Sequence, residues 1–229
     1  MSNPKRFTLV CGHYGCGKTN LSINLAVDRA KSGRKVILVD LDLVNPYFRS
    51  SDYTDVLQQH GIHVISPNYA GSTLDVPSIP AEIDAVFDTE SDVILDVGGD
   101  DAGATVLGRL SKRIRQQDYE MLYVINCYRS LTTTAQEAAR LLPEIEAASH
   151  LKATSVVNNS HLQNLTTAKD IANSIPFATK TAELLHLPLC CTTVPKQLAG
   201  EFLDFPDKIY PVTIYVRPPW EDTVEKGGI

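Results

Sequence analysis

The sequence predicts an α/β fold in which a doubly wound, mostly parallel sheet carries helices on both faces. Short apolar runs such as residues 36–39 and 93–95 recur along the chain, and uninterrupted runs of this kind are typical of parallel strands that are buried on both faces. Segments with helical spacing lie between these runs, and this alternation predicts a sheet that binds its ligand at the carboxyl ends of its strands. The length of 229 residues and the hydrophobic content of 43% suit one large domain with a sizeable core.

The first two elements lie on either side of a glycine-rich segment. An apolar run predicts a strand over residues 6–11. Leu21 and Leu25 recur at helical spacing, and they predict a helix over residues 18–32. Gly33 follows this helix directly, at a position where glycine commonly ends a helix.

The later elements continue the alternation of strands and helices. Residues 67–90 contain three prolines and are expected to be irregular, with one short helix. Thr166 is the expected N-cap of the last predicted helix. We expect residues 217–229, which begin with two prolines in the first three positions, to form an extended and partly disordered tail. The remaining predicted strands cover residues 35–40, 62–66, 91–97, 120–126, 153–158, 188–193 and 211–216, and the remaining helices cover 132–149 and 166–174.

Residues 12–19 have the pattern G-x-x-x-x-G-K-[ST], which is the phosphate-binding loop of nucleoside triphosphatases. Consecutive backbone N–H groups of such a loop wrap the phosphates, and glycines allow the close approach. Lys18 is predicted to bridge the β- and γ-phosphates and Thr19 to ligate Mg²⁺, while the next helix points its positive end at the phosphates. The predicted nucleotide-binding residues here are Gly12, His13, Tyr14, Gly15, Cys16, Gly17, Lys18, Thr19 and Asn20.

This loop narrows the fold prediction to a phosphate-loop nucleoside triphosphatase, a three-layer sandwich with one nucleotide-binding domain over residues 1–229. The alternative of a dinucleotide-binding loop requires G-x-G-x-x-G, and the glycine spacing of this chain excludes it.

Three aspartates, Asp40, Asp42 and Asp96, stand at or just beyond the ends of predicted strands. Carboxylates at these positions would face the phosphate loop, and Asp96 is expected to hold Mg²⁺, through water. Two glycines, Gly98 and Gly99, follow Asp96 closely, and a glycine there would give a flexible backbone N–H placed to sense a γ-phosphate. The competing interpretation of a strand-end aspartate is a helix or turn cap.

With these motifs, residues 6–200 resemble the MinD/ParA branch of phosphate-loop ATPases, which includes the nitrogenase iron protein and cobyrinate-type amidoligases. The resemblance implies that Asp42 orients or activates the attacking water, so that Asp42 and Lys18 are the catalytic residues. It also implies that Asp40 lies near Mg²⁺, and the expected metal site is therefore Thr19, Asp40 and Asp96. Asp96 matches the aspartate that opens the second switch, with one residue fewer before the two glycines.

The resemblance also implies a base pocket. Asn158 and Asn159 match the strand-end asparagine that binds the adenine edge, and Pro195 lies in a V-P-K segment that matches the loop packing on adenine. An asparagine amide offers adenine both a donor and an acceptor. The guanine-binding motif N-K-x-D is absent, which favours ATP over GTP. Which asparagine contacts the base stays open, and Asn126 at another strand end is equally compatible with a base contact and with a turn.

One position departs from the MinD/ParA pattern. Members of that branch carry a second lysine after the first loop glycine, and it reaches the partner's phosphates in an ATP-bound dimer. His13 stands at this position, and histidine is shorter and mostly neutral at pH 7. An ATP-dependent homodimer therefore stays open as an alternative, with Arg49 or a partner's arginine as the substitute cation.

Composition limits the partners that we expect. The net charge of −6 without a Lys/Arg block argues against a nucleic-acid partner. No apolar stretch approaches ~20 residues, and no basic amphipathic helix is evident near the C-terminus, so no membrane partner is expected. The five cysteines form no C-x-x-C pair. Together with the lack of a signal-peptide pattern, they indicate reduced thiols and a cytoplasmic protein.

We therefore expect a Mg-ATPase, slow without its partner, that acts as a nucleotide-dependent switch or maturation factor for another protein. Its switches are expected near residues 42–50 and 96–105, and the aromatic residues and arginine of 45–49 would either contact a partner or pack under the loop. Two alternatives stay open. One is an ATP-dependent small-molecule ligase or kinase of the cobyrinate or dethiobiotin type. The other is a non-hydrolysing nucleotide sensor or a spatial organiser.

Overall fold

The computed structural model shows one sheet of eight parallel strands in the order β3-β2-β4-β1-β5-β6-β7-β8. The structure describes residues 4–42, 53–66, 82–99, 101–203, 205 and 208–216, with the backbone alone at positions 101 and 102. This sheet confirms the predicted α/β fold, and every strand overlaps a predicted one. The strands are β1 (Phe7–Cys11), β2 (Val36–Leu41), β3 (His63–Ile65), β4 (Asp92–Val97), β5 (Tyr119–Ile125), β6 (Ser155–Asn158), β7 (Leu189–Pro195) and β8 (Ile209–Val212).

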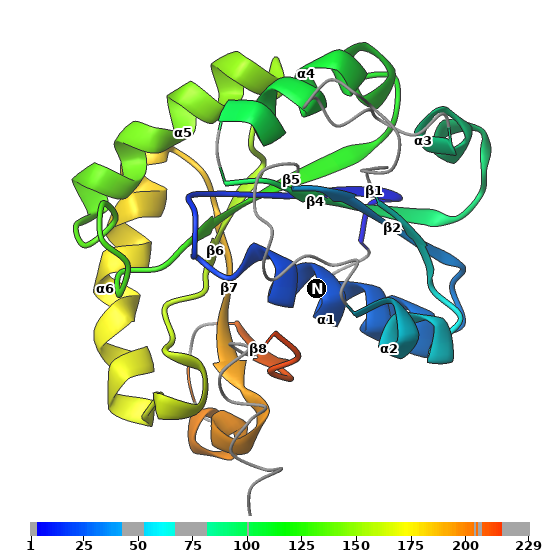
Figure 1. The fold of residues 1–229 in the computed structure, drawn as a ribbon. Coiled ribbons are helices and arrows are strands. Elements are labelled where there is room, and N and C mark those ends of the chain that lie inside the picture. The colour runs from blue at the N-terminus through cyan, green and yellow to red at the C-terminus, as the bar shows by residue number, and fades with distance from the viewer. Residues whose placement is uncertain are drawn as a thin grey trace, which may run out of the picture.

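The helices cover both faces of this sheet, as Figure 1 shows. Helices α1 and α2 pack on one face through residues such as Leu21, Leu25 and Leu57. Helices α4, α5 and α6 pack on the other face through residues such as Leu107 and Leu142. The α-helices are α1 (Lys18–Lys31), α2 (Thr54–Gln59), α3 (Glu82–Ala85), α4 (Asp101–Ile114), α5 (Ala135–Ser149) and α6 (Ala168–Leu185), and the 3-10 helices are η2 (Val86–Asp88), η3 (Gln163–Leu165) and η4 (Lys196–Phe202).

Helix α6 corrects two predictions. Its N-cap is Thr167, whose hydroxyl oxygen accepts a hydrogen bond from the amide of Asp170, while the Thr166 hydroxyl oxygen accepts one from the amide of Leu162. The helix also continues beyond the predicted end at residue 174 to Leu185. It passes through a proline because its later turns bury apolar side chains against the sheet, and that burial outweighs the lost helical hydrogen bond.

Several predicted segments lie partly or wholly outside the described residues. Of the irregular segment 67–90, the structure describes the part from Glu82 onward, where the expected short helix is α3. The tail at 217–229 lies outside the described residues, as do residues 43–50 of the expected first switch. No helix in the described parts of the chain is long and apolar enough to cross a membrane.

Candidate functional site

The phosphate loop connects the end of β1 to the start of α1, next to the centre of the sheet. Its glycines Gly12, Gly15 and Gly17 all have positive φ angles of 148°, 73° and 89°. Gly17 is the N-cap residue of α1, and a Cβ atom there would stand 2.3 Å from Asn159 Nδ2. Glycine at this position therefore satisfies both the left-handed backbone and the close approach of Asn159, the residue after β6.

Lys18 folds back over the loop. Its ammonium group donates a hydrogen bond to the carbonyl oxygen of His13 at 3.1 Å, and its side chain is buried. The segment after β4 reaches the same place, because a Cβ atom on Gly99 would stand 2.8 Å from Lys18 Nζ and 2.7 Å from the backbone of Tyr14. The predicted phosphate loop and the predicted second switch are thus in direct contact.

The predicted acidic residues converge beside this contact. Asp40 and Asp96 are register partners on the neighbouring strands β2 and β4, and all three aspartates are buried. Asp96 Oδ1 accepts a hydrogen bond from the Ser22 hydroxyl at 3.2 Å, one turn into α1 from Lys18. Asp40 Oδ1 accepts one from the amide of Asp42 at 3.0 Å.

The chemistry of these donors suits Mg²⁺, which prefers hard oxygen ligands and keeps part of its shell for water and phosphate. Asp40 and Asp96 offer carboxylates, and Thr19 is the second residue of α1. Across the described ranges, no group of three or more His, Cys, Asp or Glu side chains is arranged to hold a metal ion by itself. A magnesium ion here would therefore depend on hydroxyl and phosphate oxygens as well.

The other loop side chains differ in exposure. Tyr14 is 57% exposed, whereas Cys16 is buried, and burial raises the pKa of the Cys16 thiol. His13 is half-buried, and its burial together with the charge of Lys18 lowers its pKa from 6.5. His13 is therefore neutral near pH 7 here. The Asn20 side chain turns away from the loop and accepts hydrogen bonds from the amides of Tyr215 and Val216.

The structure gives the two strand-end asparagines different surroundings. Asn158 is fully buried and uses its amide within the fold, because Nδ2 donates to the hydroxyls of Ser174 and Thr192 and Oδ1 accepts from the amide of Ser160. These bonds leave its side chain no free donor for a base. The predicted base contact of Asn158 would require them to break.

Asn159 instead braces the phosphate loop. Its Nδ2 donates to the carbonyl oxygen of Cys16 at 2.7 Å, and its Oδ1 accepts from the Thr193 hydroxyl. The neighbouring ring of His161 also lies 3.1 Å from this Oδ1. Pro195, the third residue of the predicted base pocket, is buried at the end of β7. The base contacts of Asn159 and Pro195 stay predictions.

Sequence analysis missed one residue of this site, Arg129. It lies in the loop after β5, and its Cδ and Nε atoms stand 3.8 Å from where a Cβ atom of Gly15 would be. The available signal was its position three residues after Asn126, beyond a strand that neighbours β1 in the sheet. Loops at this edge of a parallel sheet carry ligand-binding residues.

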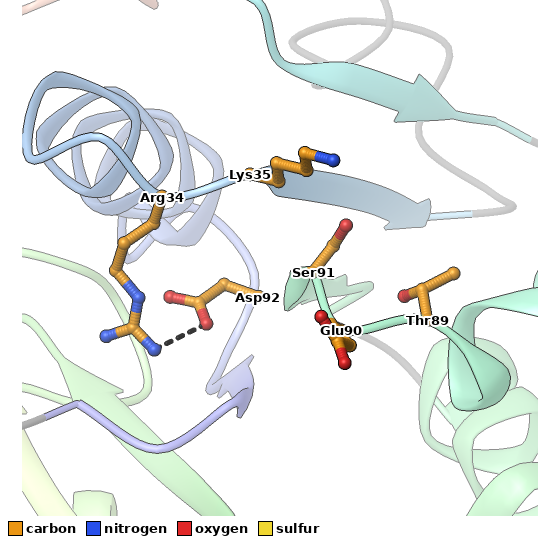
Figure 2. A pocket seen from close by; sticks show the side chains of 6 residues that line it. All are labelled: Arg34, Lys35, Thr89, Glu90, Ser91 and Asp92. Carbon is orange, nitrogen blue, oxygen red and sulfur yellow. Dashed lines mark hydrogen bonds and ion pairs between the residues drawn. The ribbon is translucent and has the colours of Figure 1, made fainter.

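A separate cavity lies away from this site. It has a volume of about 490 Å³ and stands where β2 and β4 begin, whereas the phosphate loop stands where the strands end. Figure 2 shows the ion pair of Arg34 with Asp92 at its wall, with an N–O distance of 2.6 Å. The cavity therefore does not coincide with the predicted nucleotide site. Its lining residues are Arg34, Lys35, Thr89, Glu90, Ser91 and Asp92.

Several solved structures share this fold. The signal recognition particle 54 kDa protein of Aeropyrum pernix, in complex with GDP, is 19% identical with a TM-score of 0.56 over 84% of this chain and 42% of that chain. The cell division protein FtsY of Thermotoga maritima is 19% identical with a TM-score of 0.56 over 85% of this chain and 63% of that one. Chloroplast FtsY of Physcomitrella patens is 19% identical with a TM-score of 0.54 over 84% and 59%.

These similarities concern the fold. The chain spans 42% to 63% of the length of the three structures. No protein-family model and no curated protein matches the sequence. The structural matches do not single out the MinD/ParA branch, so that resemblance stays a prediction. The eight-stranded parallel sheet, the loop after β1 and the three matches together show that the chain has the fold of phosphate-loop nucleoside triphosphatases.

Proposed function

We propose that the protein binds a nucleoside triphosphate with Mg²⁺ at residues 12–19 and hydrolyses it slowly, as a nucleotide-dependent switch for a partner protein. The contact between Lys18 and Gly99 is the observation that carries this proposal. Lys18 donates to the His13 carbonyl beside Gly99. A γ-phosphate that attracts the Lys18 ammonium would therefore change the contact that joins the loop to the segment after β4.

The chain's own residues account for the chemistry by position and charge. The loop amides and Lys18 would neutralise the phosphate oxygens, and Asp42 would orient the attacking water. Thr19, Asp40 and Asp96 would hold Mg²⁺, which supplies further charge neutralisation at the β- and γ-phosphates when bound. Such a site accelerates phosphoryl transfer by placement, with little covalent chemistry.

We propose ATP as the nucleotide. Guanine recognition in the N-K-x-D motif uses an aspartate at the fourth position. The asparagine that braces the phosphate loop here begins the run Asn159-Ser160-His161-Leu162, which has an apolar residue at that position. The GDP bound to the Aeropyrum protein is a property of that protein.

Titration calorimetry of the purified chain with Mg-ATP and Mg-GTP tests the proposal. Wild type should bind Mg-ATP more tightly than Mg-GTP, and Lys18→Ala should abolish binding because Lys18 is the loop's cation for the β- and γ-phosphates. Lys31→Ala is the matched control, since Lys31 is exposed in the last turn of the same helix. Equal ATP affinity in wild type and Lys18→Ala would contradict the proposal.

A further inference from the structure

Arg129 lies over the phosphate loop although it comes from a distant part of the chain. Its Cδ and Nε atoms stand 3.8 Å from the position of a Cβ atom on Gly15, the fourth residue of the eight-residue motif. The stem of the arginine therefore lies against Gly15, and its guanidinium lies beside the segment that would surround the phosphates.

This guanidinium has no partner among the described residues. Arg129 Nε is buried without a hydrogen-bond partner, and in the described ranges no carboxylate oxygen lies within 4.0 Å of its nitrogens. By contrast, the buried Arg29 pairs with Asp92 and Glu120. A buried N–H donor without an acceptor is costly, and a bound anion would supply the missing partner to Nε.

The surroundings of Arg129 are electropositive. Burial is the main reason that the pKa of the His161 imidazole falls to about 4, and the charge of Arg129 lowers it further. At Cys16, burial raises the thiol pKa while the charges of Lys18 and Arg129 oppose that rise. Two cationic side chains therefore act on the same loop. Such a concentration of positive charge attracts anions.

The backbone fixes where Arg129 stands. Its amide donates to the Asn126 carbonyl at 3.3 Å, and the Thr132 hydroxyl donates to the same carbonyl at 2.8 Å. Tyr128, the preceding residue, donates its phenolic hydrogen to the Asp170 carbonyl at 2.7 Å. The arginine is thus held over the loop by the fold, without an ion pair of its own in the described ranges.

We propose that Arg129 is a phosphate-binding residue of the nucleotide site, a cation supplied from within the same chain to the phosphates of a nucleoside di- or triphosphate. The proposal rests on the nucleotide binding proposed above. A guanidinium matches phosphate oxygens with paired N–H donors. Arg129 thereby takes the role for which the sequence suggested Arg49 or a partner's arginine, and Arg49 lies outside the described residues.

Calorimetry with Mg-ATP on three variants tests this role. Arg129→Gln, which removes the charge, should weaken Mg-ATP binding by about 10- to 100-fold, the range expected for a charge-assisted hydrogen bond. Arg129→Lys, which keeps the charge, should recover part of the affinity. Arg115→Gln is the matched control, because Arg115 is exposed just beyond the end of α4, and it should bind as wild type does.

Salt dependence separates a phosphate contact from a structural role. Binding by wild type and Arg129→Lys should weaken more steeply with added NaCl than binding by Arg129→Gln, because an ionic contact is screened. Equal Mg-ATP affinity in wild type and Arg129→Gln would overturn the inference while leaving nucleotide binding intact. A loss in Arg129→Gln with an unchanged salt slope would make the residue structural. If the wild-type protein does not bind Mg-ATP, the proposed nucleotide binding is contradicted, and the role of Arg129 with it.

Discussion

In the proposed mechanism, Lys18 binds the phosphates and Asp42 acts on the attacking water, so the two side chains separate binding from catalysis. The Lys18 ammonium is buried and satisfied by a backbone carbonyl, an arrangement that a phosphate oxygen can replace with a stronger, charge-assisted partner. Asp42 is buried at the end of β2, and its amide is anchored to the Asp40 carboxylate at 3.0 Å. This hydrogen bond uses the main-chain amide of Asp42, so replacing the Asp42 side chain does not remove it.

Asp42→Asn should therefore keep Mg-ATP affinity and lose most of the turnover. The asparagine has the same shape, but it cannot accept a proton from the attacking water, and a general base contributes about 100-fold or more to such reactions. Phosphate release under single-turnover conditions measures the chemical step, and calorimetry measures binding. Normal hydrolysis by Asp42→Asn would show that Asp42 serves the structure alone.

At the scale of elements, the strands were predictable because their burial on both faces leaves continuous apolar runs in the sequence. Helix α4 was missed although Leu107, Leu110 and Ile114 carry a helical period. Glycine lowers helix propensity, and Gly108 lies in the middle of this helix. A Cβ atom there would stand 2.6 Å from the Ala148 carbonyl oxygen, so the glycine reflects close packing between α4 and α5.

The parts of the candidate site that depend on local sequence were predictable as well. Strand-end carboxylates and the phosphate loop depend on local order along the chain, and the structure brings both to one edge of the sheet. The orientation of the Asn158 amide depends instead on Ser174 and Thr192, which come from other elements. Likewise, the position of Arg129 over Gly15 requires a register between β5 and β1 that no local pattern encodes.

The segment after β8 is fastened to α1 by two asparagines. Asn24 Nδ2 donates to the Thr213 carbonyl and Asn24 Oδ1 accepts from the Thr213 amide, both at 2.8 Å. Asn20 accepts from the amides of Tyr215 and Val216, and Gln163 donates to the Val216 carbonyl. This segment therefore links the start of α1 to the connection between β6 and α6.

Asn24→Ala should release this segment locally. The substitution removes the acceptor of the Thr213 amide and one of the two donors to the Thr213 carbonyl, the other being Asn20 Nδ2 at 3.1 Å, at a cost of about 1–2 kcal/mol. Hydrogen exchange at the Thr213 amide should therefore be about 10-fold faster, while core strands exchange as in wild type. Asn173→Ala, an exposed change within α6, is the control. Unchanged exchange at Thr213 would mean that other contacts hold the segment.

At the scale of the whole molecule, the proposed nucleotide site and a buried ionic cluster occupy opposite ends of the sheet. Arg29, near the end of α1, is 5% exposed. It lies 3.5 Å from Asp92 and 3.2 Å from Glu120, and it donates to the Thr8 hydroxyl at 2.6 Å. Burial raises the pKa of Asp92, against the opposing charges of Arg29 and Arg34. The cluster thus joins α1 to three strands where those strands begin.

Arg29→Met should lower the free energy of unfolding by about 3–5 kcal/mol, because it leaves Asp92 buried without its buried partner. Arg34→Met, which removes a half-exposed partner of the same carboxylate, should cost about 1 kcal/mol or less. Urea unfolding at pH 7 measures both variants.

The deficit of Arg29→Met should shrink as the pH falls. Losing Arg29 raises the Asp92 pKa in the folded state further above its unfolded value of 3.8, so the folded state binds more protons than the unfolded state between these two values. The stability of the variant relative to wild type is therefore regained on acidification and lost as the pH rises through the folded pKa of Asp92.

The Mg-ATP affinity of Arg29→Met should stay at the wild-type value because the phosphate loop lies at the other end of α1. A folded Arg29→Met protein with weakened Mg-ATP binding would show instead that the two ends of the sheet are energetically coupled.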